Sequence, residues 1–170
     1  SAPLRWQLDA VVVPVSGGGL ISGIAAAVKA IKPTCRVLAA EPAGKGLQHA
    51  LLKSTRVVDP EAADRALDTI ADAIRTRAFG PTPWAVAESL LDPTVLTVDD
   101  AQIRSAMLEI ATELKQAVEP AGAVAFAALR TAEFARLRKQ HGLKNVGVVV
   151  CGGNVDPDNF ADLVRPAKAA

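Results

Sequence analysis

The stretch DAVVVPVSGGGLISG, residues 9–23, decides the fold of this chain. Valine fills four of the five positions at 11–15, a run too short for a helix and apolar enough to predict an inner strand of a parallel sheet. Three glycines follow at 17–19, and apolar residues then recur at helical spacing over 20–31. A strand, a glycine turn and a helix in this order direct several backbone N–H groups toward one point, where a phosphate is the commonest ligand. A plain tight turn is the alternative.

Length and composition restrict the class of protein. The 170 residues suit one domain or part of a larger one, and 50% hydrophobic with 22% charged residues predicts a packed core. A net charge of +1 gives no support for nucleic acid or a membrane surface as a partner. Glycine, proline and charges interrupt the apolar runs, so we expect neither a membrane span nor a signal peptide. Two cysteines, Cys35 and Cys151, argue against a disulfide framework and favour a reducing compartment, the cytoplasm.

The remaining pattern predicts an α/β fold. The helix at 20–31 ends before Pro33 and leads to a second strand at 36–40, which makes a right-handed βαβ unit. Asp99 and Asp100 are candidate N-caps of a long helix. The other expected elements are helices within 43–54 and at 85–91, 101–117, 123–140 and 157–164, and strands at 55–58, 94–98 and 145–150.

A second glycine turn follows another apolar strand, where NVGVVV at 145–150 leads into CGG at 151–153. In an open parallel sheet, ligands bind beyond the carboxyl ends of the strands, at the point where the strand order reverses. Both glycine turns are therefore expected at the same end of the sheet, facing one ligand.

Five motifs occur together in a recognisable order: PVSGGGL at 14–20, AAEP at 39–42, TIADAI at 69–74, VEPAGA at 118–123 and CGGNVD at 151–156. This order resembles the pyridoxal-phosphate enzymes of the serine/threonine dehydratase and serine racemase family, which have fold type II. The resemblance covers a core at 9–165, with a tail at 166–170, and corresponds to the C-terminal half of the family's catalytic domain. It implies an open, twisted, mostly parallel sheet with helices on both faces.

The resemblance also assigns cofactor-binding residues. It implies that the cofactor phosphate is bound by Ser16, Gly17, Gly18, Gly19 and Leu20. It further implies that Cys151 faces the pyridine nitrogen, where a thiol can hydrogen-bond the neutral ring nitrogen and an Asp would keep it protonated. Without the resemblance, Cys151 is interpreted as a small buried core residue.

Other positions are less specific. In the resemblance, Glu41 matches the first carboxylate of a divalent-cation site for Mg or Ca. The second carboxylate of that site falls at Leu47, which cannot ligate a metal, so the cation is doubtful. Lys45 would supply a fixed positive charge in its place. A loop-bracing or capping carboxylate is the other interpretation of Glu41. Glu119 is similar to an acid near the family's cofactor, and Ala73 replaces a glycine that lines its ring.

The catalytic lysine is the missing part. The family forms a Schiff base on a lysine in an S-x-K-x-R-G-type segment, and no such segment occurs in these 170 residues. No catalytic residue is therefore assigned, and the chain is interpreted as an inactive fragment of a larger enzyme. The activity implied for that parent enzyme is a serine/threonine ammonia-lyase or serine racemase, acting through an α-carbanion of the substrate, and the family commonly forms homodimers.

Two other functions compete with this interpretation. A dinucleotide-binding domain would also begin with a strand, a glycine turn and a helix, but the third glycine of its fingerprint should stand at position 22, which is Ser22. A non-catalytic module that kept the fold and lost the lysine is the second alternative.

Overall fold

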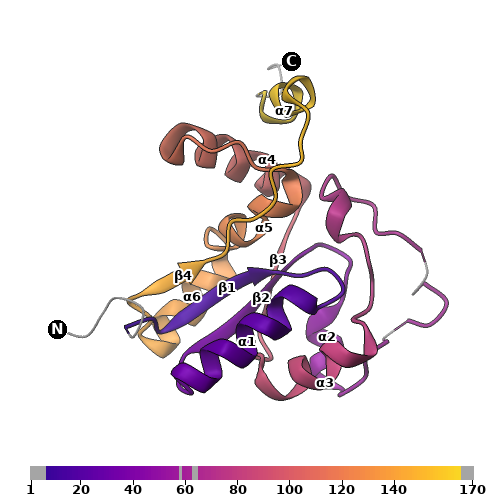
Figure 1. Ribbon diagram of the computed structural model, residues 1–170, viewed down its shortest axis with the longest axis vertical. Helices are drawn as coiled ribbons and strands as arrows, with labels where there is room; N and C mark the ends of the chain where they lie inside the picture. Colours follow the sequence, from indigo (N-terminus) through magenta and orange to yellow (C-terminus); the bar gives the residue numbers. More distant parts are fainter. Residues whose placement is uncertain (1–6, 58, 63–64, 166–170) are drawn as a thin grey trace.

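A computed structural model describes residues 7–57, 59–62 and 65–165 (Figure 1). Its four strands are β1 (Ala10–Pro14), β2 (Arg36–Pro42), β3 (Val95–Val98) and β4 (Val146–Val148). They form one parallel sheet in the order β3-β2-β1-β4. β1 is an inner strand, in which Val12 pairs with Leu38 on one side and Val148 on the other. The predicted parallel α/β sheet is confirmed.

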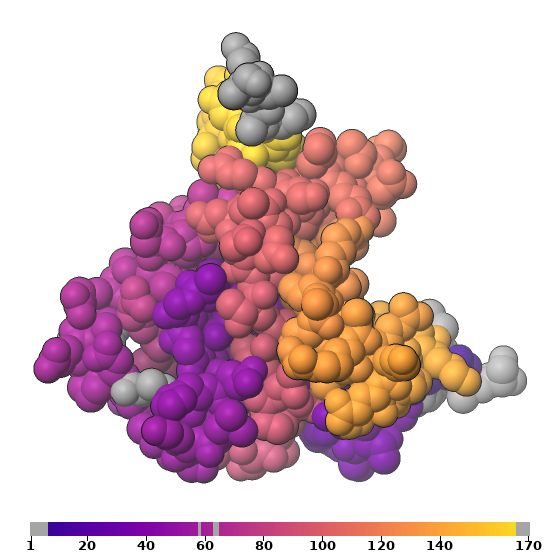
Figure 2. All heavy atoms as spheres, turned by 180° about the vertical axis from the view of Figure 1, so that it is seen from behind, coloured from indigo at the N-terminus to yellow at the C-terminus, as the bar shows by residue number. Residues whose placement is uncertain are grey.

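Helices cover both faces of this sheet, because successive strand residues point to opposite sides. Val11 and Val13 belong to the core beneath α1 (Gly19–Ile31), α2 (Leu47–Leu52) and α3 (Pro81–Leu90). Val12 belongs to the opposite core, beneath α4 (Asp100–Glu109), α5 (Pro120–Ala128) and α6 (Ala132–His141). The last helix, α7 (Pro157–Val164), lies beside α4 at one end of the molecule (Figure 2). No helix within the described ranges is long and apolar enough to cross a membrane.

The helix expected at 101–117 is shorter than predicted. α4 begins with the predicted cap, because the Asp99 side chain accepts the N–H of Gln102 at 2.8 Å and the Gln102 side chain accepts the N–H of Asp99 at 2.9 Å. It ends at residue 109, followed by a π-helical turn, η3 (Ile110–Leu114), and by Lys115 in a left-handed conformation. Ile110 is the last buried residue of this segment, so packing no longer supports a regular α-helix beyond it.

Other expected boundaries were also wrong. The helix expected at 123–140 is two helices that meet at Thr131, and the strand expected at 145–150 spans only three residues. α3 starts at Pro81 rather than 85, since proline is favoured in the first helical turn. No strand forms over 55–57, and residue 58 of that expected strand lies outside the described residues, as does the tail at 166–170.

Thr131 stabilises the start of α6, and its removal is a first test of the fold. Its hydroxyl donates to the carbonyl of Ala128 at 2.7 Å and accepts the N–H of Phe134 at 3.1 Å, while the residue is buried. We expect Thr131→Val to lower the free energy of unfolding by about 1–2 kcal/mol, measured by denaturant titration. Thr97→Val, at an exposed strand position, is the control and should change stability by less than about 0.5 kcal/mol. Equal effects of the two variants would contradict the cap.

Candidate cofactor site

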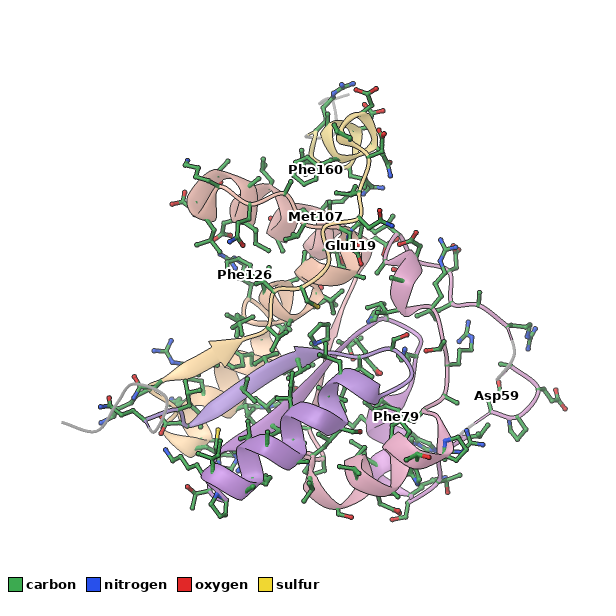
Figure 3. All side chains as sticks on the ribbon, viewed as in Figure 1. Asp59, Phe79, Met107, Glu119, Phe126 and Phe160 are labelled. Carbon is green, nitrogen blue, oxygen red and sulfur yellow. The ribbon has the colours of Figure 1, made fainter. Side chains whose placement is uncertain are left out.

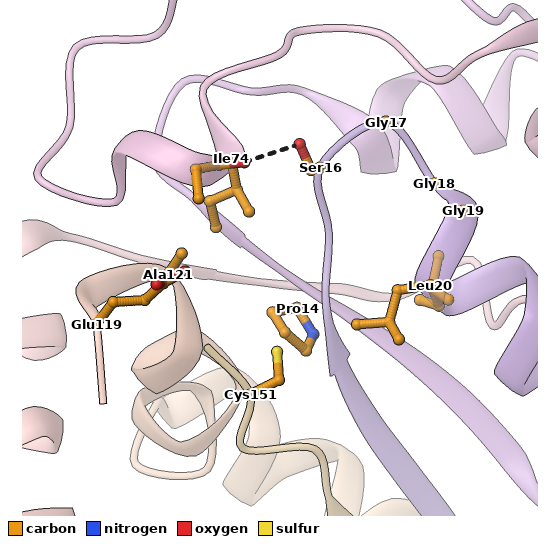
Figure 4. A pocket seen from close by; sticks show the side chains of 12 residues that line it. Pro14, Ser16, Gly17, Gly18, Gly19, Leu20, Ile74, Glu119, Ala121 and Cys151 are labelled. Carbon is orange, nitrogen blue, oxygen red and sulfur yellow. Dashed lines mark hydrogen bonds between the residues drawn. The ribbon is translucent and has the colours of Figure 1, made fainter. Parts of the chain in front are cut away.

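The glycine turn between β1 and α1 (Figure 4) contains one glycine that is packed against a side chain, between two that border open space. Gly18 has a φ of +94°, and a Cβ there would overlap the ring of Phe79. A Cβ on Gly17 or Gly19 would meet no atom within 4 Å. Gly18 is therefore required by backbone conformation and packing, whereas Gly17 and Gly19 border open space into which a ligand can approach the backbone.

The backbone amides of this turn lack acceptors. In the described part of the chain, the N–H groups of Gly17, Gly18, Gly19 and Leu20 make no hydrogen bond. The carbonyls of the same turn are used, because Gly17 accepts the N–H of Gly80 at 3.0 Å and Gly18 accepts the N–H of Ser22 at 3.0 Å. Four unpaired donors at the N-terminus of a 13-residue helix favour an anion.

All six residues predicted to bind the cofactor border one cavity. The residues lining it are Pro14, Ser16, Gly17, Gly18, Gly19, Leu20, Ile21, Ala73, Ile74, Glu119, Ala121 and Cys151. Figure 4 shows the glycine turn on one side of this cavity and Cys151 on another, with Pro14 between them. The two glycine turns thus meet at the same end of the sheet, as expected from the strand order.

The loop that carries Cys151 is fixed by the start of α5. The Glu119 N–H donates to the carbonyl of Gly152 at 3.1 Å, and the Glu119 carboxylate accepts the N–H of Asn154 at 3.0 Å. Gly122 allows this contact, since a Cβ there would overlap the carbonyl of Cys151. Burial, and then the negative charge of Glu119, raise the pKa of the Cys151 thiol, so it remains a neutral hydrogen-bonding group at pH 7.

The opposite wall of the cavity is formed by the TIADAI segment. The Ser16 hydroxyl donates to the carbonyl of Ala73 at 3.2 Å and lies 3.2 Å from the hydroxyl of Thr76. Asp100 binds the same segment from α4, accepting the Thr69 hydroxyl at 2.6 Å and the Ile70 N–H at 3.1 Å. The wall is therefore connected both to the glycine turn and to the helix behind it.

Glu41 lies outside this cavity and caps α2. The residue is 2% exposed, and its carboxylate accepts the N–H groups of Gly46 at 3.2 Å and Leu47 at 3.1 Å. Lys45 is also buried, but its ammonium group is directed to other partners than Glu41. It donates to the carbonyl of Ile74 at 3.1 Å and to the Thr76 hydroxyl at 3.5 Å. These contacts agree with the interpretation of Glu41 as a capping carboxylate. The described residues contain no group of three or more acidic, His or Cys side chains that could hold a metal ion.

The buried carboxyl of Glu41 is expected to make the free energy of unfolding depend on pH. Burial raises its pKa from 4.5 to about 7, partly offset by hydrogen bonds from Leu47 and Gly46 and by the charge of Lys45. Between these pH values the folded state keeps a proton that the unfolded chain has lost, so stability falls as pH rises through this window.

We expect Glu41→Gln to remove this slope, which amounts to as much as about 3 kcal/mol. The measurement is denaturant unfolding at a series of pH values from below 4.5 to above 7. Glu88→Gln, on the exposed side of α3, is the control and should keep the slope. An unchanged slope in Glu41→Gln would show that this carboxyl is not the cause.

Comparison with known proteins identifies the family. Residues 4–152 match the family model described as "Pyridoxal-phosphate dependent enzyme". The chain belongs to this family. The match includes both glycine turns up to Gly152, so the sequence resemblance is confirmed and the parallel α/β fold is that of fold type II pyridoxal-phosphate enzymes.

Relatives and solved structures agree with this membership. Serine racemase from Arabidopsis thaliana is 40% identical over 95% of this chain and 47% of its own length. L-threo-3-hydroxyaspartate ammonia-lyase from Saccharomyces cerevisiae is 33% identical over 93% of this chain and 45% of its own. The crystal structure of a pyridoxal 5'-phosphate-dependent aspartate racemase superimposes with a TM-score of 0.84 at 35% identity, covering 91% of this chain and 46% of that one. The chain spans about half the length of the curated relatives that it matches.

Proposed function

We propose that the glycine turn binds the phosphate of pyridoxal phosphate and that Cys151 hydrogen-bonds the pyridine nitrogen. The observation that carries this proposal is the set of four unpaired amides at 17–20, which border the same cavity as the Cys151 side chain. The open space beside Gly17 and Gly19 would be filled by any larger residue. A neutral thiol at Cys151 suits a neutral ring nitrogen, and the wall formed by Ala73 and Ile74 would contact the cofactor from a third side.

The reaction we propose is elimination or racemisation of a hydroxy amino acid, serine or threonine. Pyridoxal phosphate, when bound, withdraws electrons from the α-carbon of the substrate, which makes its proton removable. Loss of the β-hydroxyl as water followed by hydrolysis gives ammonia and a 2-oxo acid, whereas return of the proton to the opposite face inverts the α-carbon. Support comes from family membership and from relatives named as a serine racemase and an ammonia-lyase.

Within such an enzyme, we assign this chain the binding and orientation of the cofactor. The Schiff-base lysine would come from polypeptide outside these 170 residues, because the sequence lacks the lysine segment described above. Residues 1–170 would then act as the C-terminal portion of the catalytic domain. A homodimer in the cytoplasm completes the proposal, and the two free thiols of Cys35 and Cys151 suit a reducing compartment. A divalent cation at Glu41 is not part of it.

Cofactor binding tests the proposal without requiring turnover. We expect the purified protein to bind pyridoxal phosphate at least about tenfold more tightly than pyridoxal, which lacks the phosphate, in an equilibrium titration. Binding of NAD instead would support a dinucleotide domain. The complete enzyme should release ammonia or the D-isomer from L-serine or L-threonine, and cofactor binding with neither product would favour the non-catalytic module.

A further inference from the structure

A second cavity, of about 650 Å³, lies on the other side of the glycine turn and is rich in arginine. Four arginines line it, namely Arg56, Arg65, Arg75 and Arg77, and no acidic residue is among its described lining residues. A volume of this size has room for a small molecule with several polar atoms. The cavity is therefore a positively charged recess on a chain whose net charge is only +1.

Three of these guanidinium groups are fixed in place by main-chain carbonyls. Arg56 donates to Phe79 at 2.7 Å, and Arg75 donates two hydrogen bonds to Thr69 at 2.8 and 3.1 Å. Arg77 donates to Arg65 at 3.1 Å and to Gly44 at 2.9 Å. Each guanidinium has five N–H donors, so most donors of this set remain available after the anchors are made.

Among the described residues, no carboxylate forms an ion pair with these arginines. No Asp or Glu oxygen of the described chain lies within 4 Å of the guanidinium groups of Arg56, Arg65, Arg75 or Arg77. Asp59, on the same stretch of chain, is near the outer edge of the molecule (Figure 3), and its carboxylate accepts the N–H groups of Glu61 and Ala62. Several fixed, unpaired guanidinium groups around one recess attract an anion and bind its oxygens in pairs.

The arginine cavity adjoins the candidate cofactor cavity but is lined by different side chains. Gly17 borders both cavities, and Thr76, which lines the arginine cavity, is hydrogen-bonded to Ser16, which lines the other. Phe79 packs against Gly18 and lines only the arginine cavity. An occupant of this recess would therefore lie next to the glycine turn and contact different side chains from an occupant of the first cavity.

We propose that the arginine cavity is a second anion-binding site, which takes a small molecule with two or more negative charges on carboxylate or phosphate oxygens. A singly charged anion would leave most of the guanidinium donors unused. The site requires neither a cofactor in the first cavity nor any particular reaction, so it stands independently of the proposed function.

Calorimetric titration with two probes, pyrophosphate and malonate, tests this site. Each titration is run at low salt with and without pyridoxal phosphate, so that binding at the glycine turn is recognised by its loss when that cofactor is present. We expect at least one probe to bind under both conditions and to bind more weakly at high salt. Preference for pyrophosphate would identify a phosphate ligand, and preference for malonate a dicarboxylate.

Arg65→Gln is the most informative variant, because the exposed Arg65 side chain makes no hydrogen bond in the described structure and its loss should leave the fold intact. We expect it to weaken probe binding about tenfold, with Arg65→Lys intermediate. Arg136→Gln, on α6 and paired with Glu133, is the matched control and should change binding by less than about twofold. The proposal is overturned if neither probe binds, if the cofactor abolishes probe binding, or if both Gln variants weaken it equally.

Discussion

Replacing Gly18 with alanine is expected to lower the free energy of unfolding by about 3 kcal/mol and to abolish measurable binding of pyridoxal phosphate. The alanine would have to adopt a φ of +94°, and its Cβ would overlap the ring of Phe79. Phe79 cannot move freely, since it is buried and packs edge-to-face on Trp84 with ring centroids 6.0 Å apart. The turn would therefore shift, and the four unpaired amides would shift with it.

Gly23 provides the matched control for this substitution, since it lies on the same helix with open space where a Cβ would stand. Gly23→Ala should stabilise the protein by about 0.5–1 kcal/mol, because alanine has less conformational freedom to lose in a helix. Denaturant unfolding and a cofactor titration measure both variants. If Gly18→Ala were as stable as the unaltered protein and bound the cofactor normally, the packing described for the turn would be wrong.

The second large effect concerns Cys151. In the complete enzyme, Cys151→Asp is expected to reduce elimination from serine or threonine on the order of a hundredfold or more. A carboxylate in place of the neutral thiol would favour a protonated ring nitrogen and change how strongly the cofactor withdraws electrons. It would also bring a second negative charge close to Glu119, whose charge, after burial, raises the pKa of the thiol.

Serine at position 151 separates chemistry from folding in this experiment. Cys151→Ser keeps a neutral hydrogen-bonding group of similar size and should retain activity within about tenfold. The measurement is steady-state turnover together with unfolding of each variant. Unchanged turnover of Cys151→Asp would remove Cys151 from the ring-nitrogen assignment.

The sequence was sufficient to predict the parallel sheet and the meeting of the two glycine turns. Strands buried on both faces and turns rich in glycine are local signals, and the strand order then places both turns at one end. Helix lengths could not be predicted in the same way. Whether a helix continues past Ile110, or breaks at Thr131, depends on tertiary packing and on a buried side-chain cap.

The contacts that hold the glycine turn in place were beyond sequence reasoning. Thr76 and Phe79 follow the TIADAI motif in an irregular stretch, and nothing in the motif indicates that one bonds Ser16 and the other packs on Gly18. The arginine cavity was missed for the same reason. Its four arginines are spread over residues 56–77, and they converge only because the loops between β2 and α3 fold back on one another.

The central claim, that the amides of residues 17–20 bind the phosphate of the cofactor, is tested most directly by amide NMR spectra of isotope-labelled protein. Pyridoxal phosphate should shift the amide signals of Gly17, Gly18, Gly19 and Leu20 far more than signals elsewhere, and an equal concentration of pyridoxal should leave those four unchanged. The same shifts with pyridoxal, or shifts confined to other parts of the chain, would contradict the account.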